Sequence, residues 1–176
     1  MEYLQDIASE AFMPLSYGGG ITTIDQMQKL FHMGYEKVVV NTAFYQNPKL
    51  ITEAANLAGS QSIVVSIDVK NEILGRKSCY STDGTVKIGK DPVEMAKKAE
   101  DLGAGEILLN SITNDGMMEG YDLKLIRAVS ESVNIPVIAC GGAGSILDFK
   151  KVLQEGKAHA AAAGSLFVYY GSEKAV

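Results

Sequence analysis

The fold is decided by the stretch Met13-Pro14-Leu15-Ser16-Tyr17-Gly18-Gly19-Gly20 and by its second copy, Pro136-Val137-Ile138-Ala139-Cys140-Gly141-Gly142-Ala143-Gly144. Each copy is a short apolar run, typical of a strand buried on both faces, that ends in a glycine turn and is followed by a helical pattern. A shift of 122 residues (136 minus 14) aligns the copies without a gap, as far as Gly34 with Gly156. A repeat at this spacing indicates a barrel built from two similar halves.

Short apolar runs of this kind alternate with amphipathic helical segments along the whole chain, which predicts an α/β fold with a parallel sheet. The expected strands are 13–17, 37–41, 62–68, 106–111, 136–140 and 158–163, and the expected helices are 23–33, 48–58, 92–102, 123–133 and 146–155. If one half-barrel is about four strands, the chain holds about six of the eight βα units of a (β/α)8 TIM barrel. We therefore expect residues 1–176 to form a single incomplete barrel domain.

Residues 69–89 interrupt this alternation of strands and helices. Two short β-prone runs, 77–80 and 85–88, flank Asp83-Gly84, and an Asp-Gly pair between such runs is a strong hairpin signal. We expect a small hairpin inserted after the third strand, at the carboxyl-end face of the barrel, where active sites lie in this fold.

The composition excludes several classes of function. Of the 176 residues, 47% are hydrophobic and 21% charged, and the net charge of −5 without a long basic run argues against nucleic acid as the main partner. The longest apolar stretch, 158–170, is too short and too mixed to span a bilayer, and the N-terminus lacks the basic region of a signal peptide. With only two cysteines and no Cys/His cluster, we expect a cytoplasmic protein without disulfides, bound metal or cofactor.

Both glycine turns are candidate phosphate sites. Glycine lets the backbone approach an anion closely, and the N-terminus of the following helix adds a positive dipole. Glycines that only form tight turns are the alternative, but small or polar residues also end the next strand in each copy. The predicted binding residues are Gly19, Gly20, Asn41 and Thr42 at one site and Gly141, Gly142, Gly164 and Ser165 at the other. Two sites on opposite sides of a barrel suit a substrate with a phosphate at each end.

Asp68 is the candidate for acid–base catalysis, because it ends an otherwise apolar strand at the barrel mouth. Partial burial raises the pKa of a carboxyl group, which suits proton transfer. The alternative is a carboxylate that caps a loop or pairs with Lys70. Asn110 and Ser111, at the end of the next parallel strand, could bind polar groups of a substrate.

Together these segments resemble the cyclase subunit of imidazole glycerol phosphate synthase, an enzyme of histidine biosynthesis. The likeness covers nearly the whole chain. It is carried by Tyr17-Gly18-Gly19-Gly20-Ile21, Lys37-Val38-Val39-Val40-Asn41-Thr42-Ala43, Asn47-Pro48-Lys49-Leu50-Ile51, Gly59-Ser60-Gln61-Ser62, Ile67-Asp68-Val69-Lys70, Gly103-Ala104-Gly105-Glu106-Ile107, Asn114-Asp115-Gly116, Gly120-Tyr121-Asp122 and Gly141-Gly142-Ala143-Gly144.

This resemblance implies a barrel that receives ammonia from a glutaminase partner and uses it on a bis-phosphorylated aminoimidazole-carboxamide ribonucleotide. The products are imidazole glycerol phosphate and an aminoimidazole carboxamide ribotide. Asp68 matches one of the family's two catalytic aspartates. The matching phosphate-site residues are Gly20, Asn41 and Thr42 on one side, and Asp115, Gly116, Gly142, Gly164 and Ser165 on the other.

The resemblance also changes the interpretation of three positions. Asp115-Gly116 alone reads as a plain turn. Lys37 and Glu106 start strands, where charges are usually solvated ends. In the family, these two match part of a charged ring that gates ammonia entry.

The sequence also departs from the family. The other catalytic aspartate lies on the family's first strand, which has no counterpart here, so we expect no cyclase turnover from this chain alone. Met95 replaces the usual Trp, and Cys140 and Gly164 replace Ser and Ala. These details resemble cyclase paralogues associated with amidation of cell-surface sugars, in which ammonia passes to a sugar-modifying enzyme.

Two alternatives to the cyclase therefore remain: such an ammonia-channelling subunit, and the phosphoribosyl isomerase of the same pathway, which shares the half-barrel repeat. Lys37 and Glu106 favour an ammonia gate over the isomerase, which needs none. Whichever holds, six strands leave two open edges, and we expect the polypeptide to self-associate through them.

Overall fold

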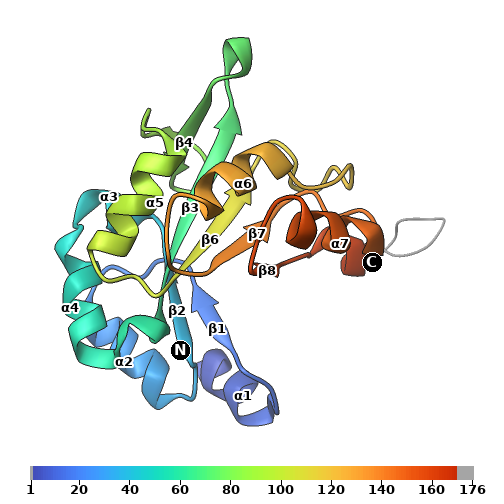
Figure 1. Cartoon of the computed structure of the whole chain (residues 1–176). Coiled ribbons are helices and arrows are strands. Elements are labelled where there is room, and N and C mark those ends of the chain that lie inside the picture. The colour runs from blue at the N-terminus through green and yellow to red at the C-terminus, as the bar shows by residue number, and fades with distance from the viewer. Residues whose placement is uncertain (1, 170–176) are drawn as a thin grey trace.

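The computed structural model describes residues 2–169 and shows a curled, open parallel sheet with helices along its outer face (Figure 1). Six of the eight strands form the parallel part of the sheet, in the order β1-β2-β3-β6-β7-β8. Their bounds are β1 Ser16–Gly18, β2 Lys37–Val40, β3 Ile63–Asn71, β6 Glu106–Ser111, β7 Val137–Cys140 and β8 Ala160–Ala161. This is the predicted partial barrel, although its first and last strands are shorter than expected.

One helix precedes β1, and at least one helix follows each strand of the parallel sheet. They are α1 Glu2–Glu10, α2 Ile24–His32, α3 Thr42–Gln46, α4 Lys49–Ala58, α5 Pro92–Asp101, α6 Leu123–Ser130, α7 Ile146–Gln154 and α8 Ser165–Val168, with 3-10 turns η1 Ser60–Ser62 and η2 Ile73–Gly75. The short α3 and α8 were not predicted, because each has only one turn and follows its strand directly. Within residues 2–169, none of the helices has the length and apolar character needed to cross a membrane.

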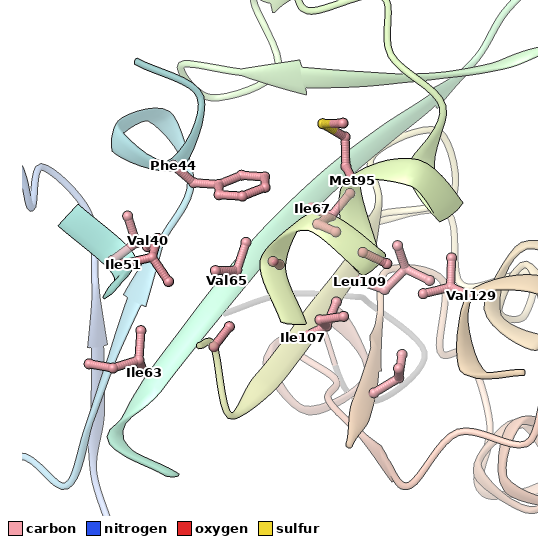
Figure 2. Packing of buried hydrophobic residues seen from close by; sticks show 14 of the residues in the cluster. Val40, Phe44, Ile51, Ile63, Val65, Ile67, Met95, Ile107, Leu109 and Val129 are labelled. Atoms are coloured by element: carbon pink, nitrogen blue, oxygen red, sulfur yellow. The ribbon is translucent and has the colours of Figure 1, made fainter. Parts of the chain in front are cut away.

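The hydrophobic core lies between the sheet and the helices. Side chains alternate along a strand, so every second residue faces the helices. On β3 these are Ile63, Val65 and Ile67, which pack with Ile107 and Leu109 of β6 under α3, α4 and α5 (Figure 2). The residues that alternate with them, such as Ser66 and Asp68 of β3 and Asn110 of β6, face the concave side, which is the interior of the partial barrel.

The hairpin after the third strand is present but larger than predicted. Strand β3 does not end at Asp68: it continues to Asn71 and pairs antiparallel with β4 (Lys77–Ser81), which pairs in turn with β5 (Val86–Lys87). The β3–β4 arm projects from the rest of the sheet (Figure 1). It lies at the carboxyl ends of the parallel strands, as expected.

The internal repeat is confirmed by matching hydrogen bonds. Both α2 and α7 begin with a capping box, Thr23 with Gln26 in the first copy and Ser145 with Asp148 in the second. These pairs differ by the same 122 residues as Pro14 and Pro136. A capping box satisfies otherwise unpaired N–H groups in the first helical turn, so both halves start this helix by the same device.

Candidate active site

A cavity of about 470 Å³ opens at the carboxyl ends of β1, β2 and β3. It brings together five residues that the sequence analysis selected from separate segments: Gly19, Gly20, Asn41, Thr42 and Asp68. Parallel strands place their carboxyl ends at one edge of a sheet, which is why residues far apart in the chain meet here.

Asp68 is held at the wall of this cavity by two donors. The Ser66 hydroxyl lies 3.2 Å and the Asn110 amide nitrogen 3.3 Å from the same oxygen, Asp68 Oδ1. Burial raises the pKa of Asp68, and the negative charges of Asp83 and Asp115 raise it further, while the two hydrogen bonds oppose the shift. The net direction is upward, so the group is suited to exchanging a proton.

The contact between Asn110 and Asp68 carries a free-energy penalty for folding. Its amide must turn its nitrogen toward the Asp68 carboxylate, because the carbonyl oxygen would repel it. In that orientation Asn110 Oδ1 is buried without a hydrogen-bond donor. An unsatisfied buried acceptor destabilises the fold by roughly 1–3 kcal/mol. Retaining it is consistent with a residue placed for the site.

Ser111, the neighbour of Asn110, lies elsewhere. Alternation along β6 puts Asn110 on the concave side and Ser111 among the buried residues on the helix side, with only 3% of its surface exposed. Its side chain lines none of the site's cavities, so the sequence-based assignment as a substrate-binding residue is not supported. Its backbone oxygen instead accepts from the N–H groups of Asn114 and Asp115 and shapes the next loop.

The first glycine turn is open. A Cβ atom added at Gly19 or Gly20 would meet no atom of the described residues within 4 Å, and both glycines have positive φ. The backbone N–H groups of Gly19, Gly20 and Ile21 donate to no other group within residues 2–169. Uncommitted N–H groups on an open backbone are what an anion requires.

The side chains of Asn41 and Thr42 are already engaged next to this turn. Asn41 donates to the backbone oxygen of Ser66 at 3.0 Å, and Thr42 Oγ1 accepts from the backbone N–H of Thr82 at 3.1 Å. These hydrogen bonds hold the end of β2 against β3 and against the β4–β5 hairpin. An anion here would therefore be bound mainly by backbone groups.

The second glycine turn is enclosed. A Cβ at Gly142 would lie 2.2 Å from the backbone oxygen of Gly120, and one at Gly144 would lie 1.9 Å from that of Met118. A bulky residue at Gly142 would therefore collide with the 113–120 loop.

Around this turn the other predicted residues do assemble. Asp115, Gly116, Gly141, Gly142, Gly164 and Ser165 line one small cavity together with Cys140. The Asp148 carboxylate accepts hydrogen bonds from two nearby backbone N–H groups, that of Gly144 at 3.1 Å and that of Ser145 at 2.8 Å. Of the turn itself, the N–H groups of Gly142 and Ala143 have no acceptor in the described part of the chain.

Lys37 and Glu106 lie at the opposite, amino-terminal end of the barrel interior. They start β2 and β6, which flank β3, and their side chains form an ion pair across it. Each side chain keeps some exposure, 29% and 20% respectively, so the pair borders solvent. The two residues are thus partners rather than separately solvated strand ends.

A metal centre finds no support in the described residues 2–169, where no three His, Cys, Asp or Glu side chains cluster. Both histidines lie away from the cavity. His32 contacts the backbone oxygen of Gln28 within its own helix, and His159 accepts from the N–H of Val137 at the start of β7.

Sequence reasoning missed three residues of the site: Ser66, Thr82 and Asp83. Ser66 could have been found, because a residue two positions before Asp68 on a strand faces the same side. The sequence analysis identifies Asp83 only as part of the hairpin turn. Its place in the cavity depends on how the hairpin folds back over the sheet.

Comparison with known proteins shows the family of the chain. A sequence profile described as "Histidine biosynthesis protein" matches residues 1–173. The chain belongs to this family. Among its histidine biosynthesis relatives, the imidazole glycerol phosphate synthase subunit HisF of Alkaliphilus metalliredigens is 44% identical over 169 residues, which are 96% of this chain and 67% of the relative.

Two further relatives are provisionally named synthase subunits. The hisF3 subunit of Vibrio vulnificus is 47% identical over 174 residues, which are 98% of this chain and 67% of the relative. The hisF2 subunit of Pseudomonas aeruginosa is 45% identical over 175 residues, 99% of this chain and 70% of the relative. The three identities are too close to separate the hisF2 and hisF3 subunits from HisF.

Proposed function

We propose that this chain is a cyclase component of imidazole glycerol phosphate synthase. In this role it uses ammonia to convert a bis-phosphorylated aminoimidazole-carboxamide ribonucleotide into imidazole glycerol phosphate. The family membership supports the pathway. We further propose that residues 1–176 act as one domain and that the protein works in the cytoplasm.

The observation that carries the proposal is the position of Asp68. It lies at the same end of the sheet as both glycine turns, close to the open one and linked through Asn110 to β6. A substrate bound by a phosphate at each turn would extend across the mouth past this carboxyl group. Asp68 would then transfer protons during ring closure.

Ammonia would enter from the opposite face. The Lys37–Glu106 ion pair borders the amino-terminal opening of the barrel interior, and the concave side leads from there to Asp68. We assign the pair as part of an ammonia gate and expect a glutaminase subunit to dock on that face. The isomerase alternative assigns no role to this pair, because the isomerase needs no ammonia gate.

Substrate binding tests the proposal on the chain as it exists. Calorimetry with the bis-phosphorylated ribonucleotide should show saturable binding that competes with inorganic phosphate. Turnover would be measured with an ammonium salt after the chain is joined to the two preceding βα units of the Alkaliphilus metalliredigens relative. Binding without turnover in that completed barrel would contradict the cyclase assignment.

A second candidate is an ammonia-channelling subunit for amidation of a cell-surface sugar. Cys140 favours it, because this thiol replaces the usual serine at the cavity of the second turn. Burial raises the pKa of the Cys140 thiol, so the residue remains neutral and offers only a weak donor. Passage of ammonia through the completed barrel from a glutaminase subunit supplied with glutamine, without ribonucleotide turnover, would favour this candidate.

A further inference from the structure

The tight turn between β4 and β5 folds back onto the site. Thr82 and Asp83 line the same cavity as Asp68, Asn41 and Thr42. The turn closes on itself through the Thr85 N–H and hydroxyl, which both donate to the Thr82 oxygen, at 3.0 and 2.5 Å.

Two contacts from outside fix where the turn lies. Thr42, next to the open glycine turn, accepts from the Thr82 N–H at 3.1 Å. Lys70 of β3 donates to the Gly84 oxygen at 2.6 Å and lies over the Tyr80 ring, 4.8 Å from its centre. The turn is therefore tied both to the end of β2 and to the strand that carries Asp68.

The backbone of this turn is strained. Thr82, Asp83 and Gly84 all have φ in the left-handed region, at 53°, 53° and 72°. Asp and Gly adopt it readily in this type of turn, but a β-branched threonine does not. Strain of this kind persists where the surroundings impose it, often at functional sites. At Thr82 it directs the N–H toward Thr42.

We propose that Asp83 is a positioning residue of the site: a second carboxylate, held beside Asp68 by the Thr82–Thr42 contact, that makes Asp68 retain its proton more readily. Among residues 2–169, no lysine or arginine lines the cavity to neutralise the two carboxylates. Lys70, the cation nearest along β3, is committed to Gly84 and Tyr80. The proposal rests on the proposed function only in taking Asp68 as the proton-transfer group.

Other groups around Asp68 are accounted for. Asp115, from the loop after β6, raises the pKa of Asp68 in the same direction as Asp83, but more weakly. Tyr45 of α3, Cys79 of β4 and Cys140 of β7 also couple to Asp68, and all three have raised pKa values, so they stay neutral at physiological pH. The turn's own carboxylate is therefore the principal charge that acts on Asp68.

The experiment is an NMR titration of the Asp68 carboxyl carbon in the 176-residue chain, assigned with Asp68→Asn and free of any substrate. Asp83→Asn should shift the Asp68 titration to lower pH, because it removes a neighbouring negative charge. Asp101→Asn is the matched control: Asp101 ends α5, which runs back toward the amino-terminal face, and it should leave the titration unchanged.

Thr42→Val provides a second route that keeps both carboxylates. It removes the acceptor of Thr82, so Asp83 should move away and the Asp68 titration should shift in the same direction as in Asp83→Asn. An Asp68 titration that does not move in either variant would overturn the proposal. The titration does not require turnover, so an unmoved Asp68 titration would not contradict the proposed function. In the same way, a lack of turnover in the completed barrel would not contradict this inference.

Discussion

At the scale of single residues, the environment that suits Asp68 to its proposed proton-transfer role also reduces the stability of the fold. Its carboxyl group is partly buried, so its pKa is raised from the ordinary value of 3.8. The folded chain therefore binds this proton more tightly than the unfolded chain does. Above the folded pKa the ionised carboxylate destabilises the fold, and below 3.8 both states are protonated and the effect disappears.

Asp68→Asn should accordingly raise the melting temperature at neutral pH and leave it unchanged in acid, below the ordinary aspartate pKa. In the completed barrel the same change should lower turnover by about 10²–10⁴-fold, the usual contribution of general acid–base catalysis. Thermal unfolding at both pH values and a turnover assay provide the measurements. A loss of stability at neutral pH would show that Asp68 has a structural role instead.

The glycines also differ residue by residue. Gly20→Ala places a methyl group in the open turn and should weaken phosphate binding, with a modest loss of stability from its φ of +66°. Gly75→Ala is the matched control, because Gly75 also has open space and a positive φ of +73° but lies at the tip of the β3–β4 arm, outside both turns; it should cost a similar modest stability and leave phosphate binding unchanged. Calorimetry with phosphate and urea denaturation would separate the two effects, and equal binding by both variants would count against the open turn as a site.

Gly142→Ala should lower the stability of the chain for a different reason, a clash with neighbouring backbone. Its Cβ would lie 2.2 Å from the Gly120 oxygen, and its φ is +113°. We expect it to destabilise the chain by more than about 1 kcal/mol, since the native backbone does not suit an L-residue. Native stability in urea would show that the 113–120 loop can move aside.

At the scale of elements, the repeat makes a matched pair of helix starts. Thr23→Ala and Ser145→Ala each remove the capping side chain of α2 or α7. Each should lower the free energy of unfolding by about 1 kcal/mol, and the double variant by about the sum, because the two caps share no partner. Urea denaturation measures all three, with Ser9→Ala within α1 as the control. A double variant no worse than either single one would argue against independent caps.

At the scale of the whole molecule, β1 and β8 are the edges of the open sheet. Large exposed apolar side chains lie near both: Phe12 and Met13 before β1, with 98% and 70% of their surfaces exposed, and Phe167 after β8, with 71%. Unpaired strand edges flanked by apolar surface favour association with another chain. We propose that the polypeptide self-associates there.

Sedimentation of the purified chain should therefore show concentration-dependent oligomers. Phe12→Asp combined with Phe167→Asp should shift the distribution toward monomer. Ile73→Asp is the control, because Ile73 is 86% exposed but lies at the tip of the β3–β4 arm, away from both edges. A stable monomer with one cooperative thermal transition in the unmodified chain would contradict the prediction.

The sequence by itself determined the parallel strand order, the repeat and most residues at the mouth. These follow from local patterns: buried strands read as continuous apolar runs, glycine turns recur at a fixed spacing, and parallel strands end at one edge. Thr23 with Gln26 and Ser145 with Asp148 repeat the same cap because their sequences repeat.

Only the tertiary structure decided what the repeated turns can do. Gly142 is enclosed because the 113–120 loop covers its turn, whereas no loop in the described part of the chain covers the turn of Gly20 in this way. It also decided that Lys37 pairs with Glu106 and that Asp83 joins Asp68. Each of these depends on contacts between segments far apart in the chain, and no local pattern encodes the distance between such segments.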